Sequence, residues 1–193
     1  MDRKQLVAGS FVLLTWLAWP GSSAAQCEPV DDIRFICDLI GPEDLAIVPG
    51  GDLVIASGNQ EGGRLHAVHV RDKTTTVLFP TDTRDERHDA TRYPTCPGPL
   101  DLTDPNDFRA HGLYLAPGSD DRHTLYVVHH GTRESIEVFD VDAGQGSPSV
   151  TWVGCAVAPE ALRLNSVVAL PGDGFATTSP GTGDVWEWHA DGG

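Results

Sequence analysis

The sequence predicts an all-β protein, a β-propeller built from four-stranded blades, and two observations lead to this prediction. Short apolar runs are separated by Pro-Gly and acidic turns along the chain. One pattern also recurs in 41–58, 111–131 and 165–181: a polar residue, an apolar run, Pro-Gly, an acidic turn and a second apolar run. Internal similarity at such intervals is typical of sheets repeated around a central channel.

The first repeat, GPEDLAIVPGGDLVIASG, predicts a hairpin with Glu43 and Asp44 at the mouth of its first strand. Alternating apolar residues are typical of a half-buried strand, and the Pro-Gly-Gly turn interrupts the alternation. A second hairpin follows, with strands expected at 64–70 and 75–79. Together the two hairpins complete a first blade at about 41–80. Before them, an apolar cluster at 33–36 predicts an edge strand.

The segment 81–107 is polar, rich in proline and aspartate, and without periodicity. A loop of this length inside a compact domain is usually functional or pinned by a disulfide, and Cys96 favours pinning. The charged residues between 82 and 89 predict a solvated loop, with ligand gating as the alternative.

The remaining repeats predict two more blades, at about 111–157 and 165–193. Four strands are expected in the second blade and three in the third, at 113–115, 124–129, 135–142, 150–157, 167–170, 174–178 and 184–189. About three blades of an expected six would leave unpaired strand edges, so we expect the chain to be about half of a longer ring. A three-bladed protein that closes by dimerising is the alternative.

The first residues predict a secretory signal peptide at 1–25, which would leave a domain at 26–193. A basic start, a short apolar run and Ser23-Ala24-Ala25 form this pattern, and Pro20-Gly21 argues against a membrane span. We therefore expect a secreted or periplasmic protein. The net charge of −15 disfavours nucleic acid and anionic lipid as partners.

All four cysteines lie in the exported part, where disulfides persist. Of the possible pairings we favour Cys27 with Cys37 and Cys96 with Cys155, a choice that the sequence leaves open. No CxxC spacing is present, which disfavours a zinc site.

Equivalent positions of successive repeats converge in a propeller. If the first strand of each blade is innermost, Glu43, Asp44, His111 and Asn165 gather at one end of the channel. Glu43 and Asn165 would then begin an all-oxygen Ca²⁺ site, whereas neighbouring Asp44 points to the other side of its strand. The alternative is that all three side chains bind turn backbone at the strand entries.

His111 and His130 stand at the two ends of one predicted hairpin, which brings the two imidazoles together. Such a pair can act as a base and its orienting partner near neutral pH. His129 points to the opposite face of the strand, and the other histidines fit surface or packing positions. No G-x-S-x-G or phosphate-binding glycine motif is present. Tryptophans 152, 186 and 188 are expected to pack between blades.

The motifs GPEDLAIVPGG, HGLYL, LYVVHHGTRESIEVF and NSVVAL, in this order, resemble the paraoxonases and the wider gluconolactonase and regucalcin-like group of six-bladed propellers. The resemblance covers most of 41–170. It implies a catalytic Ca²⁺ held by Glu43 and Asn165, and a structural Ca²⁺ held by Asp44 and the carbonyl of Leu113. It also implies that His111 and His130 serve hydrolysis of lactones, aryl esters and phosphotriesters.

One departure from the resemblance concerns the structural ion. The acidic residue that follows the asparagine in this family is Ser166 here, so that ion loses a charged ligand. The remaining ligands of the catalytic ion would come from later blades.

The leading functional hypothesis is an exported Ca²⁺-dependent hydrolase of lactones or aryl esters, with His111 taking a proton from water. A non-catalytic binding propeller and a sugar-acid lactonase are the alternatives. The paired histidines disfavour the lactonase of the gluconolactonase type, which relies on its metal and an acid.

Overall fold

The computed structural model describes residues 27–104, 107–144, 146 and 148–190. The predicted signal peptide and the last residues of the third predicted blade lie outside these ranges. The chain divides into two compact units, 1–34 and 35–193. In the described part of the first unit, Val30 and Ile33 form an isolated antiparallel bridge. The edge strand expected at 33–36 is not formed, because Ile33 and Phe35 stay exposed and bury no apolar face.

The second unit is all-β in its described part, with no helix there. Most strands are short runs rich in apolar residues, and several are followed directly by Gly or Pro, which favour turns. The strands are β1 (Pro42–Ile47), β2 (Leu53–Gly58), β3 (Leu65–His69), β4 (Thr74–Phe79), β5 (Arg109–Ala116), β6 (Arg122–His130), β7 (Ser135–Asp142), β8 (Ser149–Val157), β9 (Val167–Ala169), β10 (Phe175–Ser179) and β11 (Asp184–Trp188).

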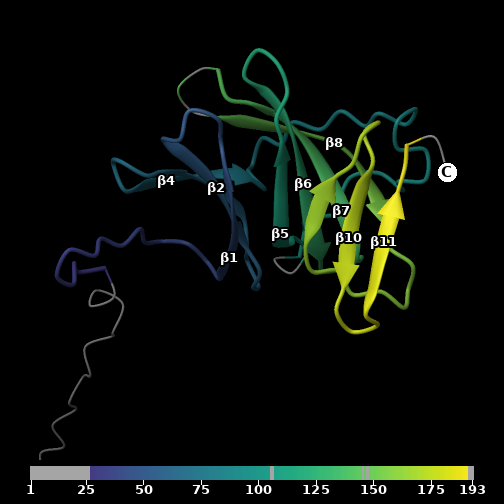
Figure 1. The fold of residues 1–193 in the computed structure, drawn as a ribbon, viewed down its shortest axis with the longest axis horizontal. Coiled ribbons are helices and arrows are strands. Elements are labelled where there is room, and N and C mark those ends of the chain that lie inside the picture. The colour runs from purple at the N-terminus through teal and green to yellow at the C-terminus, as the bar shows by residue number, and fades with distance from the viewer. Residues whose placement is uncertain (1–26, 105–106, 145, 147, 191–193) are drawn as a thin grey trace, which may run out of the picture. The chain divides into compact units, whose positions relative to one another are not determined.

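The strands form three antiparallel sheets in the orders β1-β2-β3-β4, β5-β6-β7-β8 and β11-β10-β9, coloured blue, green and yellow in Figure 1. The all-β prediction is therefore confirmed, and so is its division into sheets of four, four and three strands. The first strand of each sheet lies at a sheet edge. Strand β5 contacts both β1 and β9, so the three first strands converge.

Aromatic side chains join the sheets into one core. Phe79 of β4 packs edge-on against Phe139 of β7, with ring centroids 4.9 Å apart. Trp188 of β11 stacks on Phe175 at 5.4 Å and on Tyr93 at 5.5 Å. Because Tyr93 belongs to the long loop, this stack ties the loop to the third sheet.

Within the segment 81–107, residues 85–89 are more ordered than the composition predicts. The backbone N–H of Trp152 donates to the carbonyl of Asp85 at 2.9 Å, and Arg87 N–H donates to the carbonyl of Trp152 at 2.8 Å. Residues 85–89 thus run beside β8 and cover its free edge. The sequence could not show this pairing, since it depends on a strand about 65 residues away.

The disulfide Cys96–Cys155 pins the same loop to β8, as predicted. Cys27 and Cys37 are also disulfide-bonded, and no described cysteine is free. Disulfides indicate an oxidising compartment. The described residues form no helix that is long and apolar enough to cross a membrane.

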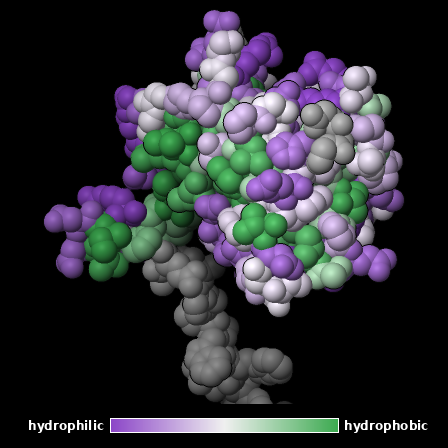
Figure 2. Space-filling model, turned by 45° about the vertical axis from the view of Figure 1, so that its right-hand side comes forward, coloured by the Kyte–Doolittle hydropathy of each residue, from purple (hydrophilic) through white to green (hydrophobic). Residues whose placement is uncertain are grey.

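Several large apolar side chains remain at the surface. Leu45 and Ile47 of β1 are 64% and 65% exposed, and Val185 of β11 is 64% exposed. One face of the molecule, drawn in Figure 2, shows hydrophobic residues distributed among hydrophilic ones. The described sheets therefore leave apolar surface uncovered at β1 and β11.

Candidate functional site

Two irregular strand positions create the site. The pairing of β1 with β2 shifts register between Pro42 and Leu45, and that of β5 with β6 shifts between Ala110 and Leu113. Such bulges re-aim the side chains that they carry. They contain Glu43 and Asp44 on β1 and His111 on β5, the residues that the sequence analysis singled out.

Four side chains form a continuous line across these strands, which we call the acid–histidine chain: Glu43, His111, His130 and Glu134. His111 Nδ1 lies 3.0 Å from His130 Nε2, and His111 Nε2 lies 3.2 Å from Glu43 Oε1. At the far end, His130 Nδ1 lies 3.0 Å from Glu134 Oε2. The predicted histidine pair is therefore brought together.

The four side chains of the acid–histidine chain differ in their exposure to solvent. The side chains of His111, His130 and Glu134 are 17%, 18% and 12% exposed, whereas that of Glu43 is 50% exposed. The acid–histidine chain thus runs from the well-buried carboxylate of Glu134 to the solvent-facing carboxylate of Glu43.

Counting protons shows what the acid–histidine chain can do. Its three close contacts would need three protons, but two neutral imidazoles carry only two. If His130 donates to Glu134 from Nδ1, its Nε2 must accept from His111 Nδ1. His111 Nε2 then holds a lone pair that faces Glu43. In this arrangement His111 Nε2 is the ring nitrogen without a proton, 3.2 Å from Glu43 Oε1.

Asp44 binds backbone on two strands. Its Oδ1 accepts from its neighbour Leu45 N–H at 2.8 Å, and its Oδ2 accepts from Leu113 N–H on β5 at 2.8 Å. Leu113 thus offers its N–H to Asp44, whereas the resemblance implies that its carbonyl joins Asp44 on an ion. Glu43 and Asp44 thus contact different groups on β5, the His111 imidazole and the Leu113 N–H.

Asn165 approaches the site through its backbone. A Cβ atom on Gly112 would lie 2.3 Å from the carbonyl oxygen of Asn165, so only glycine beside His111 permits this close packing. The Asn165 side chain is exposed and makes no hydrogen bond with any described residue. Ser166 Oγ, at the position where the family has an acid, lies 3.1 Å from Thr178 Oγ1.

The residues expected to hold calcium differ in how well they fit it. Glu43 and Asn165 have exposed side chains with the oxygen donors that Ca²⁺ prefers, and Glu43 Oε1 lies 3.2 Å from His111 Nε2. Asp44 has both oxygens engaged by N–H donors. Within the described ranges, no group of three or more Asp, Glu, His or Cys is placed to hold a metal ion.

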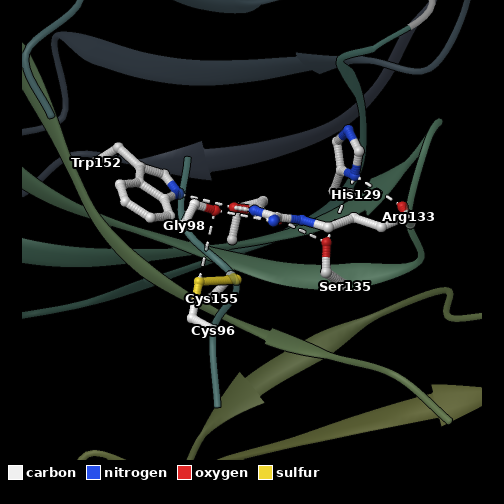
Figure 3. Close-up of a disulfide and its surroundings, with 8 residues drawn as sticks. Cys96, Gly98, His129, Arg133, Ser135, Trp152 and Cys155 are labelled. Atoms are coloured by element: carbon white, nitrogen blue, oxygen red, sulfur yellow. Dashed lines mark hydrogen bonds and ion pairs between the residues drawn. A yellow bond between two sulfur atoms is a disulfide. The ribbon is translucent and has the colours of Figure 1, made fainter. Parts of the chain in front are cut away.

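A buried polar cluster holds the turn that carries Glu134. The carboxylate of Glu137, 0% exposed, accepts from Arg133 Nε at 2.9 Å and from Trp152 Nε1 at 2.7 Å. Arg133 also donates to the carbonyl of Gly98, next to the disulfide (Figure 3). Arg133 thus connects the loop 81–107, through Gly98, to the β6–β7 turn that follows His130.

His129 takes part in this cluster and not in the site, as predicted. It is fully buried, with Nε2 2.6 Å from the carbonyl of Asp107 and Nδ1 3.0 Å from that of Arg133. Burial lowers the pKa of His129, against the opposing influence of the Glu137 carboxylate. The packing role expected of His66 also holds, since it is buried and burial lowers its pKa.

The sequence analysis missed Glu134. The signal was present, because Glu134 follows His130 by four residues in HHGTRE, and a tight turn between β6 and β7 folds it back. What the sequence could not show is that the turn would be anchored by Arg133, which directs Glu134 to His130.

The sequence was compared with protein-family models and with curated proteins. No family model matches the sequence, and a search of curated proteins finds no match.

Proposed function

We propose that the protein is an exported, calcium-dependent hydrolase of lactones or aryl esters. The observation that carries the proposal is the acid–histidine chain, in which His111 lies within hydrogen-bond distance of both His130 and the exposed carboxylate of Glu43. Structural histidines are usually buried and bonded to backbone, as His129 is. His111 and His130 are instead bonded to each other and to acids at an accessible edge.

Each residue of the acid–histidine chain has a role in the proposed reaction. Glu134 holds the proton of His130 on Nδ1, which makes His130 Nε2 the acceptor for His111. His111 Nε2 takes a proton from water as the water oxygen bonds to the carbonyl carbon of the substrate. The tetrahedral intermediate then breaks the bond to its leaving oxygen, which regains a proton from His111. No serine nucleophile is required.

Glu43 and Asn165 would hold Ca²⁺ beside this base. When bound, the ion supplies Lewis-acid polarisation of the scissile carbonyl and stabilisation of the developing oxyanion. Turning the Glu43 carboxylate toward a cation would also release His111 Nε2 for water. The same carboxylate would thus serve the metal and uncover the base.

The proposed architecture is a β-propeller. Two features support it: the convergence of β1, β5 and β9, and the exposed apolar residues Leu45, Ile47 and Val185. Apolar blade faces of this kind are covered by neighbouring blades in a closed ring. Secretion is part of the proposal because the disulfides require an oxidising compartment.

The test is hydrolysis of phenyl acetate and a γ-lactone with and without a chelator, comparing wild type with Glu43→Ala. Chelation should abolish turnover, added Ca²⁺ should restore it, and Glu43→Ala should raise the Ca²⁺ concentration needed by about tenfold or more. Glu187→Ala on β11 is the matched control, since that exposed acid lies outside the site. Absence of hydrolysis under every metal condition would favour the non-catalytic binding propeller.

A further inference from the structure

A pocket of about 410 Å³ opens beside His130. Its walls are Arg109 at the start of β5, the 130–134 turn and Arg163 from the segment before β9. Arg109 pairs with His130 across β5 and β6, which places the two side chains on one face. The pocket therefore adjoins the acid–histidine chain directly.

Among the residues that the structure describes, the Arg109 side chain has no hydrogen-bond or ion-pair partner. It is half-buried, and its Nε is fully buried and makes no hydrogen bond. No ion pair joins it to any residue in the described ranges, whereas Arg133 in the same wall pairs with Glu137 at 2.8 Å. Leaving a buried donor unsatisfied costs free energy, so an unpaired guanidinium here calls for a ligand.

The charge of the pocket is opposite to that of the protein. The whole chain carries −15, yet the pocket wall holds three arginines against Glu134. Glu137 beneath the wall neutralises Arg133, and Arg163 lies 3.7 Å from Glu134 with its side chain 73% exposed. Arg109 is left as uncompensated positive charge beside the proposed reaction centre.

We propose that this pocket is an oxyanion-binding subsite that selects substrates bearing a carboxylate or phosphate next to the scissile ester or lactone. The inference rests on the proposed function for its catalytic meaning, but the binding of an anion does not depend on hydrolysis. Arginine suits the task because its planar fork binds carboxylate and phosphate oxygens in pairs. Arg109 would contact the anion from the inner wall and Arg163 from the rim.

The experiment compares two esters that differ by one charge, phenyl acetate and 4-acetoxybenzoate, in wild type, Arg109→Gln and Arg163→Gln. Arg109→Gln should raise KM for 4-acetoxybenzoate about tenfold and leave KM for phenyl acetate unchanged. Arg109→Lys, which keeps the charge but loses the fork, should show an intermediate effect. Arg122→Gln is the control, an exposed arginine at the opposite end of β6.

Calorimetric titration with benzoate and with phenyl phosphate separates this inference from the proposed function. Wild type should bind one of the two more tightly, which identifies the anion class, and Arg109→Gln should weaken that binding about tenfold. If neither ester is hydrolysed but the anion still binds through Arg109, the proposed function fails and the subsite stands. Equal anion binding by wild type, Arg109→Gln and Arg163→Gln, or no binding by wild type, would overturn the subsite.

Discussion

His111 Nδ1 lies 3.0 Å from His130 Nε2, with the two ring centroids 5.2 Å apart and the ring planes inclined at 53°. The two histidines are nineteen residues apart in the sequence and meet because β5 and β6 are antiparallel. One ring donates to the other, so the pair can pass a proton along a defined direction. The Glu43 and Glu134 carboxylates at its two ends make the pair one functional unit.

The first prediction concerns this pair. His111→Gln should lower kcat for lactone and aryl-ester hydrolysis by about 10²–10⁴-fold, because glutamine cannot accept the proton from water. His130→Gln should lower it less, since His111 remains. Steady-state kinetics with phenyl acetate measures both effects. His69→Gln is the control, a half-buried histidine at the end of β3. Unchanged turnover in His111→Gln would show that another group is the base.

The second prediction concerns Glu134 as a positioning residue. Glu134→Gln should lower kcat on the order of tenfold and leave KM unchanged, because a neutral amide no longer stabilises positive charge on the histidine pair. The amide oxygen can still accept from Leu164 N–H, which lies 2.6 Å from Glu134 Oε1. The thermal midpoint should therefore stay close to that of wild type. A loss of stability that accounts for the loss of activity would reduce Glu134 to a structural residue.

The third prediction concerns the buried Glu137. Glu137→Gln should lower the free energy of unfolding by about 3–5 kcal/mol, since it leaves the buried Arg133 charge without its partner. Urea denaturation measures this change. Asp142→Asn removes the exposed pair with Arg122 and should cost about 1 kcal/mol or less. Similar losses in the two variants would contradict the role assigned to the buried cluster.

The fourth prediction concerns pH and His129. Burial lowers the pKa of His129 in the folded state, so the unfolded chain binds a proton more readily below the ordinary value of about 6.5. The stability that neutral His129 contributes is present above about pH 6.5 and is lost as pH falls, by at most about 1.4 kcal/mol per pH unit for one group.

The measurement for this prediction is the free energy of unfolding from urea titrations between pH 7.5 and 5, for wild type and His129→Asn. The fall in stability toward low pH should be shallower in His129→Asn. His69→Gln, a substitution at the half-buried end of β3, is the control. An identical slope in all three proteins would show that His129 is not the group responsible.

Local sequence information was enough for the strands. Alternation and Pro-Gly turns located the hairpins because these signals act between neighbouring residues. Strand β7 was expected at 135–142 and is observed at Ser135–Asp142. The same local logic brought His111 and His130 together, since a hairpin joins its own ends. Glu134, in the turn between β6 and β7, was within reach of the same argument because it follows His130 by four residues, but it was not predicted.

Apart from the Cys96–Cys155 disulfide and the approach of Glu43 to His111, long-range contacts were beyond the sequence. The bulges of β1 and β5 depend on the strands with which they pair, so they could not be read from alternation. The pairing of residues 85–89 with β8, the lone cation Arg109 and the bond from Asp44 to Leu113 N–H likewise appear only after the chain is packed.

The sequence by itself thus determined that the protein is β-structured, is divided into repeated hairpins, is acidic, and has two histidines at matched hairpin ends. The tertiary structure decided which acids flank those histidines and where the uncompensated charge lies. The physical reason is range: strand and turn preferences arise within a few residues. The proton order of the acid–histidine chain requires atoms from β1, β5, β6 and the following turn to meet within hydrogen-bond distance.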